Sequence, residues 1–383
     1  MSTSAPAGFE ASGIAAGLKT NGNPDLALIV NRGPSQAAAA VFTSNRAQAN
    51  PILWSKQAAA DGVVSAIVLN SGGANCFTGA EGFQTTHATA EAVASSLGVS
   101  AGDVLVCSTG LIGEQLDRAK LTTGAATAAG ALSAEGWAAA ASAIMTTDTV
   151  SKTAAHAADG WSIAGMAKGA GMLAPGLATM LVVLATDADL ASHELDAALR
   201  EATRVSFDRL DSDGCMSTND QVTLMASGAS AIRPDTVEFT RALTDVCTEL
   251  AQKLQGDAEG ASHDIRIEVI GAASEDDAVE VGRSVARSNL FKAAIFGNDP
   301  NWGRVLAAIG TTGAEFDPYQ VDVSMNGVRV CHAGGPDAPR EQVDLAPRAV
   351  HVLIDLQVGS STATILTNDL THDYVHENSA YAS

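Results

Sequence analysis

The chemically most unusual segment of the chain runs from a lysine, through a glycine-rich stretch, into a hydrophobic run. Lys168 stands before residues 169–176 (GAGMLAPG), and Thr179 is the first polar side chain of the run that follows. A threonine hydroxyl in this place could act as a nucleophile. A threonine at the mouth of a buried strand is more often a strand former whose hydroxyl bonds to the backbone. Taken by themselves, these residues therefore favour a structural threonine and leave the nucleophile as the alternative.

Sequence signatures of the common cofactors are missing. The chain has no GxxxxGK[ST] or HExxH motif, and no GxGxxG that opens a helix after a strand. Sites for ATP, NAD and zinc are therefore disfavoured. His372 and His376 have the i, i+4 spacing of helical metal ligands, but they lie in a tail that reads as irregular. We expect no metal site there.

Short β-forming runs recur along the chain and predict most of its strands. Each run is rich in apolar residues and stops at a cluster of Gly, Asn or Ser. Residues 350–356 and 363–366 are expected to form a final hairpin around Gly359. The other expected strands are residues 26–30, 38–42, 64–69, 104–107, 180–185, 222–225, 265–270 and 321–324.

Helices are expected to cover these strands. Residues 120–145 are rich in alanine and predict one helical layer, split at Gly130. Strands outnumber the crossover helices that a parallel sheet needs, so we predict an α/β or α+β layered fold with mixed β-sheets covered by helices. Residues 233–235 (RPD) are a weak candidate for a domain boundary. Two apolar stripes predict further amphipathic helices: Leu195, Ala198, Leu199 and Ala202, and Phe239, Leu243, Val246 and Leu250.

The composition excludes several classes of protein. Among 383 residues, Lys plus Arg is 22 and Asp plus Glu is 43, and the net charge of −21 disfavours nucleic acids and anionic membrane surfaces as partners. A hydrophobic content of 46% suits a folded globular chain. The five cysteines form no CxxC pair, and the first residues do not resemble a secretory signal. We therefore expect a cytoplasmic protein.

Seven short motifs lie in a fixed order along the chain. They are residues 108–113 (STGLIG), 145–149 (MTTDT), 168–172 (KGAGM), 178–181 (ATML), 257–261 (DAEGA), 297–304 (GNDPNWGR) and 377–381 (ENSAY). Through these motifs the chain resembles the glutamate N-acetyltransferase (ornithine acetyltransferase) family of arginine biosynthesis over essentially its whole length.

The resemblance implies that the precursor cuts itself between Ala178 and Thr179, which would give an autoprocessed two-chain architecture of residues 1–178 and 179–383. In this chemistry the Thr179 hydroxyl attacks the Ala178 carbonyl, and hydrolysis of the resulting ester leaves Thr179 with a free α-amine. Such an amine has a pKa of about 7.7–8.0, close enough to neutrality to serve as the general base for its own hydroxyl. Gly169, Gly171 and Gly176 would let the backbone approach the bond tightly.

The same resemblance assigns roles to individual residues. Thr109 and Gly110 would form the oxyanion hole, with the Thr109 hydroxyl and the Gly110 amide as donors. Because the substrates are amino acids, Lys168 suits their carboxylate and Glu259 their ammonium group, although either charge alone is more often a solvated surface charge. The implied substrate contacts are Thr146, Lys168, Thr179, Glu259, Asn378 and Ser383.

Three places depart from the family pattern. Residues 70–75 read NSGGAN where relatives often have NSGNAN, His263 stands where lysine is usual, and the chain ends in Ala382 and Ser383. Ser383 keeps a terminal hydroxyl, so this change is mild. His263 leaves the charge near Glu259 open.

The reaction implied by the resemblance is transfer of acetyl from N²-acetyl-L-ornithine to L-glutamate through an acetyl-Thr179 ester. It needs no cofactor and no metal, and the processed chains are expected to form a heterotetramer with two copies of each. Three alternatives stay open. They are an enzyme that also accepts acetyl-CoA, a related autoprocessed amidase or aminopeptidase, and an uncleaved acidic binding protein.

Overall fold

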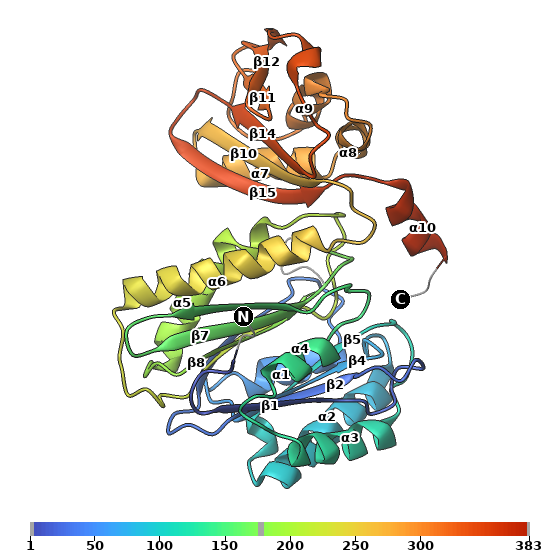
Figure 1. The fold of residues 1–383 in the computed structure, drawn as a ribbon, viewed down its shortest axis with the longest axis vertical. Coiled ribbons are helices and arrows are strands. Elements are labelled where there is room, and N and C mark those ends of the chain that lie inside the picture. The colour runs from blue at the N-terminus through green and yellow to red at the C-terminus, as the bar shows by residue number, and fades with distance from the viewer. Residues whose placement is uncertain (1–3, 175–179, 381–383) are drawn as a thin grey trace.

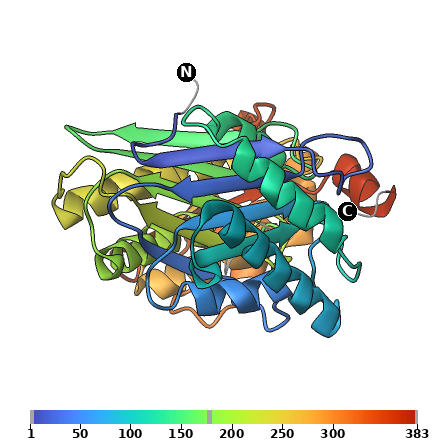
Figure 2. The ribbon, with the colours of Figure 1, turned by 90° about the horizontal axis from the view of Figure 1, so that it is seen from below.

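Two β-sheets stack face to face in the larger part of the molecule (Figures 1 and 2). The computed structural model describes residues 4–174 and 180–380. The first sheet has the strand order β1-β2-β4-β5, with β1 (Phe9–Ile14), β2 (Leu26–Asn31), β4 (Ala66–Ser71) and β5 (Val104–Thr109). The second sheet has the order β3-β9-β8-β7-β6, with β3 (Ala37–Phe42), β6 (Lys152–Ala157), β7 (Ser162–Lys168), β8 (Leu181–Thr186) and β9 (Gln221–Ala226).

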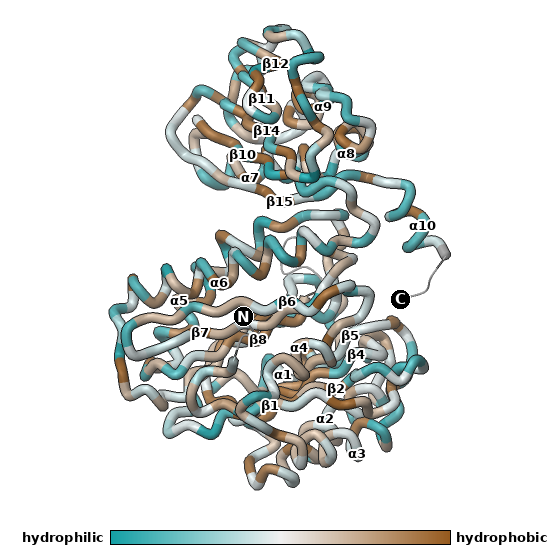
Figure 3. The backbone as a smooth tube through the Cα atoms, in the orientation of Figure 1, coloured by the Kyte–Doolittle hydropathy of each residue, from teal (hydrophilic) through white to brown (hydrophobic). Residues whose placement is uncertain are grey.

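The central strands are apolar on both faces because both faces are covered. On β2, Leu26 and Leu28 pack with the helices outside the first sheet, whereas Ala27 and Ile29 pack against the second sheet. This alternation follows from the two-residue period of a strand. Figure 3 shows hydrophobic residues concentrated on these strands, between the layers.

Helices complete a four-layer arrangement. Outside the first sheet lie α2 (Gly79–Leu97) and α3 (Arg118–Gly130), and α1 (Asn50–Ala58) packs beside β5. Outside the second sheet lie α5 (Ser192–Val205) and α6 (Thr236–Gly256), whose predicted apolar stripes are buried as expected. Both sheets contain parallel and antiparallel neighbours. The predicted layered fold with mixed sheets is therefore confirmed.

The alanine-rich segment splits as predicted but does not form one layer. The chain turns after α3, and α4 (Trp137–Ala143) then lies on the opposite face of the first sheet, against β1 and β2. Ser133 exchanges backbone hydrogen bonds with Ala11 of β1, which carries the chain around the sheet edge. The fully buried Trp137 then inserts into the core between the sheets.

A third sheet with its own hydrophobic core forms the upper part of the molecule in Figure 1. Its order is β13-β12-β11-β14-β10-β15, with β10 (Asp264–Ala272), β11 (Asp322–Met325), β12 (Val328–His332), β13 (Gly335–Pro336), β14 (Ala349–Asp355) and β15 (Ser361–Asn368). The helices of this part are α7 (Glu275–Ala286), α8 (Asn289–Phe296) and α9 (Trp302–Ile309). Helix α10 (His372–Ala380) follows and stands apart from the sheet.

Three expectations about the second half of the chain are wrong. The strands β14 and β15 do not form a hairpin, because β10 lies between them and pairs with β14 in parallel and with β15 antiparallel. Residues 233–235 are no domain boundary, since β9 before them and α6 after them belong to the same hydrophobic core. The tail that contains His372 and His376 is helical rather than irregular. In the described part of the chain, no helix is both long and apolar enough to span a membrane.

Candidate active site

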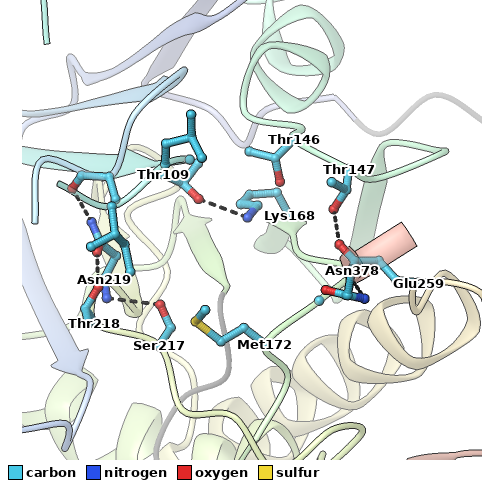
Figure 4. Close-up of a pocket in the computed structure, with 15 residues that line it drawn as sticks. Thr109, Thr146, Thr147, Lys168, Met172, Ser217, Thr218, Asn219, Glu259 and Asn378 are labelled. Carbon is cyan, nitrogen blue, oxygen red and sulfur yellow. Dashed lines mark hydrogen bonds between the residues drawn. The ribbon is translucent and has the colours of Figure 1, made fainter. Parts of the chain in front are cut away.

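A cavity of about 310 Å³ lies where the ends of β5 and β7 meet the loops before β9 and after α6. Figure 4 shows side chains from these separate elements pointing into it. The cavity brings together all the predicted site residues that the structure describes, which are Thr109, Gly110, Thr146, Lys168, Glu259 and Asn378. Ala178, Thr179 and Ser383 were also predicted and lie outside the described residues.

The segment that carries the predicted cleavage bond begins and ends beside this cavity. β7 and β8 are antiparallel neighbours, and Lys168 at the end of β7 pairs with Leu181 at the start of β8. The Met180 amide donates a hydrogen bond to Asp220, and the Met180 carbonyl accepts one from Gln221. Met180, the first described residue after the bond, is therefore held in place by Asp220 and by Gln221 at the start of β9.

Thr109 and Gly110 stand at the end of β5 in a backbone conformation that requires glycine. Gly110 has φ 130°, and a Cβ atom there would lie 2.6 Å from the Gly73 nitrogen. The Thr109 carbonyl accepts hydrogen bonds from the amides of Gly72 and Gly73. The Thr109 hydroxyl accepts one from Lys168 Nζ at 3.1 Å. A hydroxyl that accepts from an ammonium group has its own proton left to donate elsewhere.

Lys168 is a buried cation surrounded by carboxylates. It is 1% exposed, and burial lowers the pKa of its ammonium group, whereas Asp148, Asp220 and Glu259 act to raise that pKa. A charge in this setting interacts strongly with its neighbours, because little water screens it. Lys168 can therefore attract a substrate carboxylate while it orients the Thr109 hydroxyl.

Asp148 is a functional candidate that the sequence reasoning missed. One of its oxygens, Oδ1, accepts hydrogen bonds from the Gly169 amide at 2.7 Å and from Lys152 at 2.6 Å. The other oxygen accepts from the Thr146 amide at 2.9 Å. Burial alone would raise the pKa of Asp148, but Lys168, Lys152 and the Gly169 amide together hold it below the usual value. Asp148 thus fixes the loop of Thr146 to the end of β7.

Glu259 faces the cavity and is held by groups on both of its oxygens. Thr147 donates to Oε1 at 2.7 Å, and Asn378 of α10 donates to Oε2 at 3.0 Å (Figure 4). The Glu259 amide donates to the Ala170 carbonyl in the glycine-rich loop. Thr147 was also missed, although it follows the predicted Thr146 directly in the MTTDT motif.

Asn219 connects the two sides of the cavity and was missed as well. Its side-chain amide donates to the carbonyls of Ala74 at 2.6 Å and Ser108 at 2.8 Å. Ser108 precedes Thr109, and Asn219 lies just before β9, so this side chain fixes the end of β5 against the start of β9. Its place just before a predicted strand was the only signal in the sequence.

His263, the departure from the family pattern, has a structural environment. Its ring is buried, with Nδ1 2.7 Å from Asp369 and Nε2 3.0 Å from the Leu345 carbonyl. The ring therefore contacts Asp369 rather than Glu259. Over residues 4–174 and 180–380 there is no cluster of three or more His, Cys, Asp or Glu side chains arranged to hold a metal ion.

A buried ion-pair network beside the cavity yields a stability prediction. Lys152 pairs with Asp148 at 2.6 Å and with Asp257 at 2.5 Å, and its side chain is fully buried. Removing the cation leaves two buried carboxylates without it, so Lys152→Met should lower the free energy of unfolding by about 3–5 kcal/mol. Urea denaturation followed by circular dichroism measures this change.

The matched control is Lys253→Met, which removes an exposed lysine paired with Glu249. A solvated pair of this kind contributes at most about 1 kcal/mol. If both variants lose the same small amount, the network around Lys152 is not a significant source of stability.

Comparisons with known proteins identify the family of the chain. The ArgJ family profile matches residues 10–383. The chain is 64% identical over 383 residues to "Arginine biosynthesis bifunctional protein ArgJ" of Streptomyces avermitilis, with 100% of both chains covered. It is 51% identical to the protein of the same name in Mycobacterium leprae, over 99% of this chain and 95% of the relative. A crystal structure of ornithine acetyltransferase complexed with ornithine, from Mycobacterium tuberculosis, matches 46% of this chain and 94% of its own at 51% identity and a TM-score of 0.44. On the full-length matches, the chain belongs to the ArgJ family.

Proposed function

We propose that this protein is an ornithine acetyltransferase of arginine biosynthesis, which moves acetyl from N²-acetyl-L-ornithine to L-glutamate through an ester on Thr179. The observation that carries the proposal is the cavity at which Thr109, Lys168 and Glu259 meet the start of β8. It offers a hydroxyl donor, a cation and a carboxylate within one small volume. Family membership supplies the substrates.

Self-cleavage would come first. The Thr179 hydroxyl attacks the Ala178 carbonyl carbon, the bond from that carbon to the Thr179 nitrogen breaks, and the nitrogen takes up the proton to become an amine. Water then hydrolyses the ester between residues 178 and 179. The glycine-rich loop supports this step, because Gly169 has φ 152°, a conformation that side chains disfavour.

Acetyl transfer then uses the same oxygen. The free amine of Thr179 takes the hydroxyl proton as the oxygen attacks the acetyl carbonyl, and it passes this proton to the departing ornithine nitrogen. The developing oxyanion is stabilised by the Gly110 amide and by the Thr109 hydroxyl, whose oxygen already accepts from Lys168. Glutamate then attacks the ester, and the product is N-acetylglutamate.

Substrate binding is assigned by charge. Lys168 attracts the α-carboxylate that both substrates share, and Glu259 attracts an ammonium group. Thr146, Asn378 and Ser383 are proposed as further contacts. An adjoining cavity of about 600 Å³ shares Glu259 and is lined by Asp257, Asp373 and Glu377 together with Arg348. Its carboxylates outnumber this cation, which suits the side-chain ammonium of ornithine.

The direct test incubates the purified protein with acetylornithine and glutamate. We expect equal amounts of ornithine and N-acetylglutamate by mass spectrometry. Free acetate without acetylglutamate would instead identify an amidase, and no turnover at all would refute the proposal. The relatives are named bifunctional, which favours acetyl-CoA as a second donor. A parallel reaction with acetyl-CoA and glutamate tests that activity.

The processed form is proposed to be a cytoplasmic heterotetramer of two 1–178 and two 179–383 chains. Support for the pairing comes from the second sheet, in which β8 contacts β7 and β9 contacts β3 across the two segments. Support for a reducing compartment comes from the cysteines, which are all unpaired. Light scattering of the processed protein measures the assembly.

Gly171→Ala tests the role of Glu259. A Cβ atom at Gly171 would lie 2.4 Å from Glu259 Oε2, so the carboxylate must move and lose its contacts with Thr147 and Asn378. We expect the KM for glutamate to rise about tenfold or more, as for loss of one charged hydrogen bond. Steady-state kinetics measure this change.

Gly130→Ala is the matched control, because nothing lies within 4 Å of a Cβ atom at that position. It should leave the KM for acetylornithine and the KM for glutamate unchanged. If Gly171→Ala also leaves them unchanged, Glu259 does not bind substrate.

A further inference from the structure

The proposed mechanism leaves one buried carboxyl group next to the reacting segment unused. Asp220 is 1% exposed and directly precedes β9. Its Oδ1 atom accepts a hydrogen bond from the Met180 amide at 3.1 Å. In the part of the chain that the structure describes, its Oδ2 atom has no hydrogen bond of normal geometry, although the Ser217 hydroxyl acts on the carboxyl group. A buried carboxyl oxygen without such a hydrogen bond is costly, so this atom calls for an explanation.

Among the described residues, Lys168 is the cation whose charge acts on Asp220. Burial raises the pKa of Asp220 well above its usual value, against the opposing effects of the Ser217 hydroxyl, the Met180 amide and Lys168. The positive charge of Lys168 also interacts with the carboxylates of Asp148 and Glu259, which raise its pKa. The positive charge of Lys152 lowers that pKa. Lys168 therefore interacts with several carboxylates and does not neutralise Asp220 alone.

Self-cleavage would create a second cation on the residue bonded to Met180, whose amide Asp220 already accepts from. The nitrogen of Met180 is joined to Thr179 by one peptide bond, and consecutive backbone nitrogens lie within roughly 4 Å of each other in any chain. Before cleavage the Thr179 nitrogen is a neutral amide. After cleavage it is an amine that can carry a positive charge and three N–H donors.

We propose that Asp220 is the counter-ion of the amino group that self-cleavage creates on Thr179. The inference rests on the proposed function, because it requires the cut before Thr179. In the precursor the carboxyl group lacks this partner, and the cut supplies it, so the product is favoured over the precursor. During acetyl transfer the proton moves from the Thr179 oxygen to its nitrogen and then to the leaving nitrogen. Asp220 stabilises the intermediate ammonium ion and gains no proton.

This role predicts the direction in which the pKa of the Thr179 amine changes when Asp220 is replaced. A nearby carboxylate raises the pKa of an amine, whereas Lys168 lowers it. Without Asp220 the amine loses this carboxylate while Lys168 remains, so the pKa of the Thr179 amine falls. The amine must be neutral to act as a base, and the acidic limb of the kcat/KM profile reports its pKa. Removing the carboxylate should therefore move that limb to lower pH.

The experiment compares Asp220→Asn with the unsubstituted protein. We expect the 179–383 chain to appear at least tenfold more slowly by intact mass, and the acidic limb to shift down by about one pH unit. Asp187→Asn is the matched control, because Asp187 is also a buried carboxylate that accepts backbone N–H groups, but it lies at the opposite end of β8. It should change neither measurement.

An unshifted acidic limb in cleaved Asp220→Asn overturns the proposal, even if cleavage is slow, because a merely structural role would slow cleavage alone. If Asp220→Asn does not unfold cooperatively or does not cleave, Asp220→Glu decides, since it restores a carboxyl group. Asp220→Glu must cleave itself and must keep the acidic limb of its kcat/KM profile at the pH of the unsubstituted protein. If it does not meet both conditions, the proposal is overturned. Loss of acetyl exchange in the unsubstituted protein, with normal cleavage, would instead contradict the proposed function.

Discussion

A Thr179→Ala chain is expected to remain one polypeptide of 383 residues and to exchange no acetyl group. Both steps use the same oxygen, which alanine lacks, so cleavage should stop completely. The rate of acetyl transfer should fall by at least about 10⁴-fold, as when a catalytic nucleophile is removed. Intact mass and amino-terminal sequencing measure the first effect, since only a cut chain can yield the sequence Thr-Met-Leu-Val.

Two further variants make this result specific. Thr179→Ser keeps a hydroxyl and should retain both cleavage and transfer at reduced rates. Thr186→Ala removes a buried hydroxyl at the other end of β8 and should be cleaved and active. A Thr179→Ala protein that is cut at this bond, or that still exchanges acetyl, would refute the assignment of the nucleophile.

Thr109→Val should lower kcat by about 10²–10³-fold while the protein still folds and is cleaved. Valine keeps the shape of the buried threonine at the end of β5 but removes the hydroxyl that Lys168 orients. That hydroxyl is proposed to donate to the oxyanion, which is present only in the transition state and intermediate. The loss should therefore fall on kcat rather than on KM.

Steady-state kinetics with acetylornithine and glutamate test this prediction. Thr89→Val is the control, since Thr89 is a buried threonine of α2 whose hydroxyl bonds only within its own helix in the described structure. An unchanged kcat in Thr109→Val would exclude an oxyanion role. A raised KM with unchanged kcat would show that Thr109 binds substrate in its ground state.

Sequence patterns predicted the strands that are buried on both faces. Runs of branched residues mark β2, β4, β5, β8 and β9, because covered faces require apolar side chains throughout. β7 was not predicted, since its sequence SIAGMAK contains small and polar residues. A Cβ atom at Gly165 would lie 2.8 Å from Leu184 and from Leu250, so this strand needs a glycine for close packing. Such a requirement becomes visible only when the neighbours are known.

The sequence did not allow us to predict the order of the strands in a sheet or the face of the sheet on which a helix packs. Nothing in the local pattern of β14 and β15 reveals that β10, about 80 residues earlier in the chain, separates them. The alanine-rich composition of α3 and α4 favours helix but does not distinguish the two faces of the first sheet. These choices depend on long-range packing.

The candidate site was found by resemblance rather than by residue chemistry alone. Thr109, Lys168 and Glu259 looked individually like a turn residue and two surface charges, yet they line one cavity. Asn219 and Asp220 were missed, because their partners at Ser108 and Met180 lie far away in sequence. A polar residue beside a predicted strand has no distinguishing feature until the fold shows what it contacts.

The strand order of the second sheet has a consequence for the cut molecule. Residues before the Ala178–Thr179 bond form the edges of this sheet, with β3 at one side and β7 and β6 at the other. Residues after the bond form its middle strands, β9 and β8. The uncut chain can return from urea at a rate independent of dilution. The processed molecule must instead reassemble from two polypeptides, so its recovery becomes second order and its transition midpoint rises with protein concentration. After processing, no peptide bond joins residues 1–178 to residues 179–383. A molecule that unfolds in dilute solution therefore has to meet its partner chain by diffusion before it can refold.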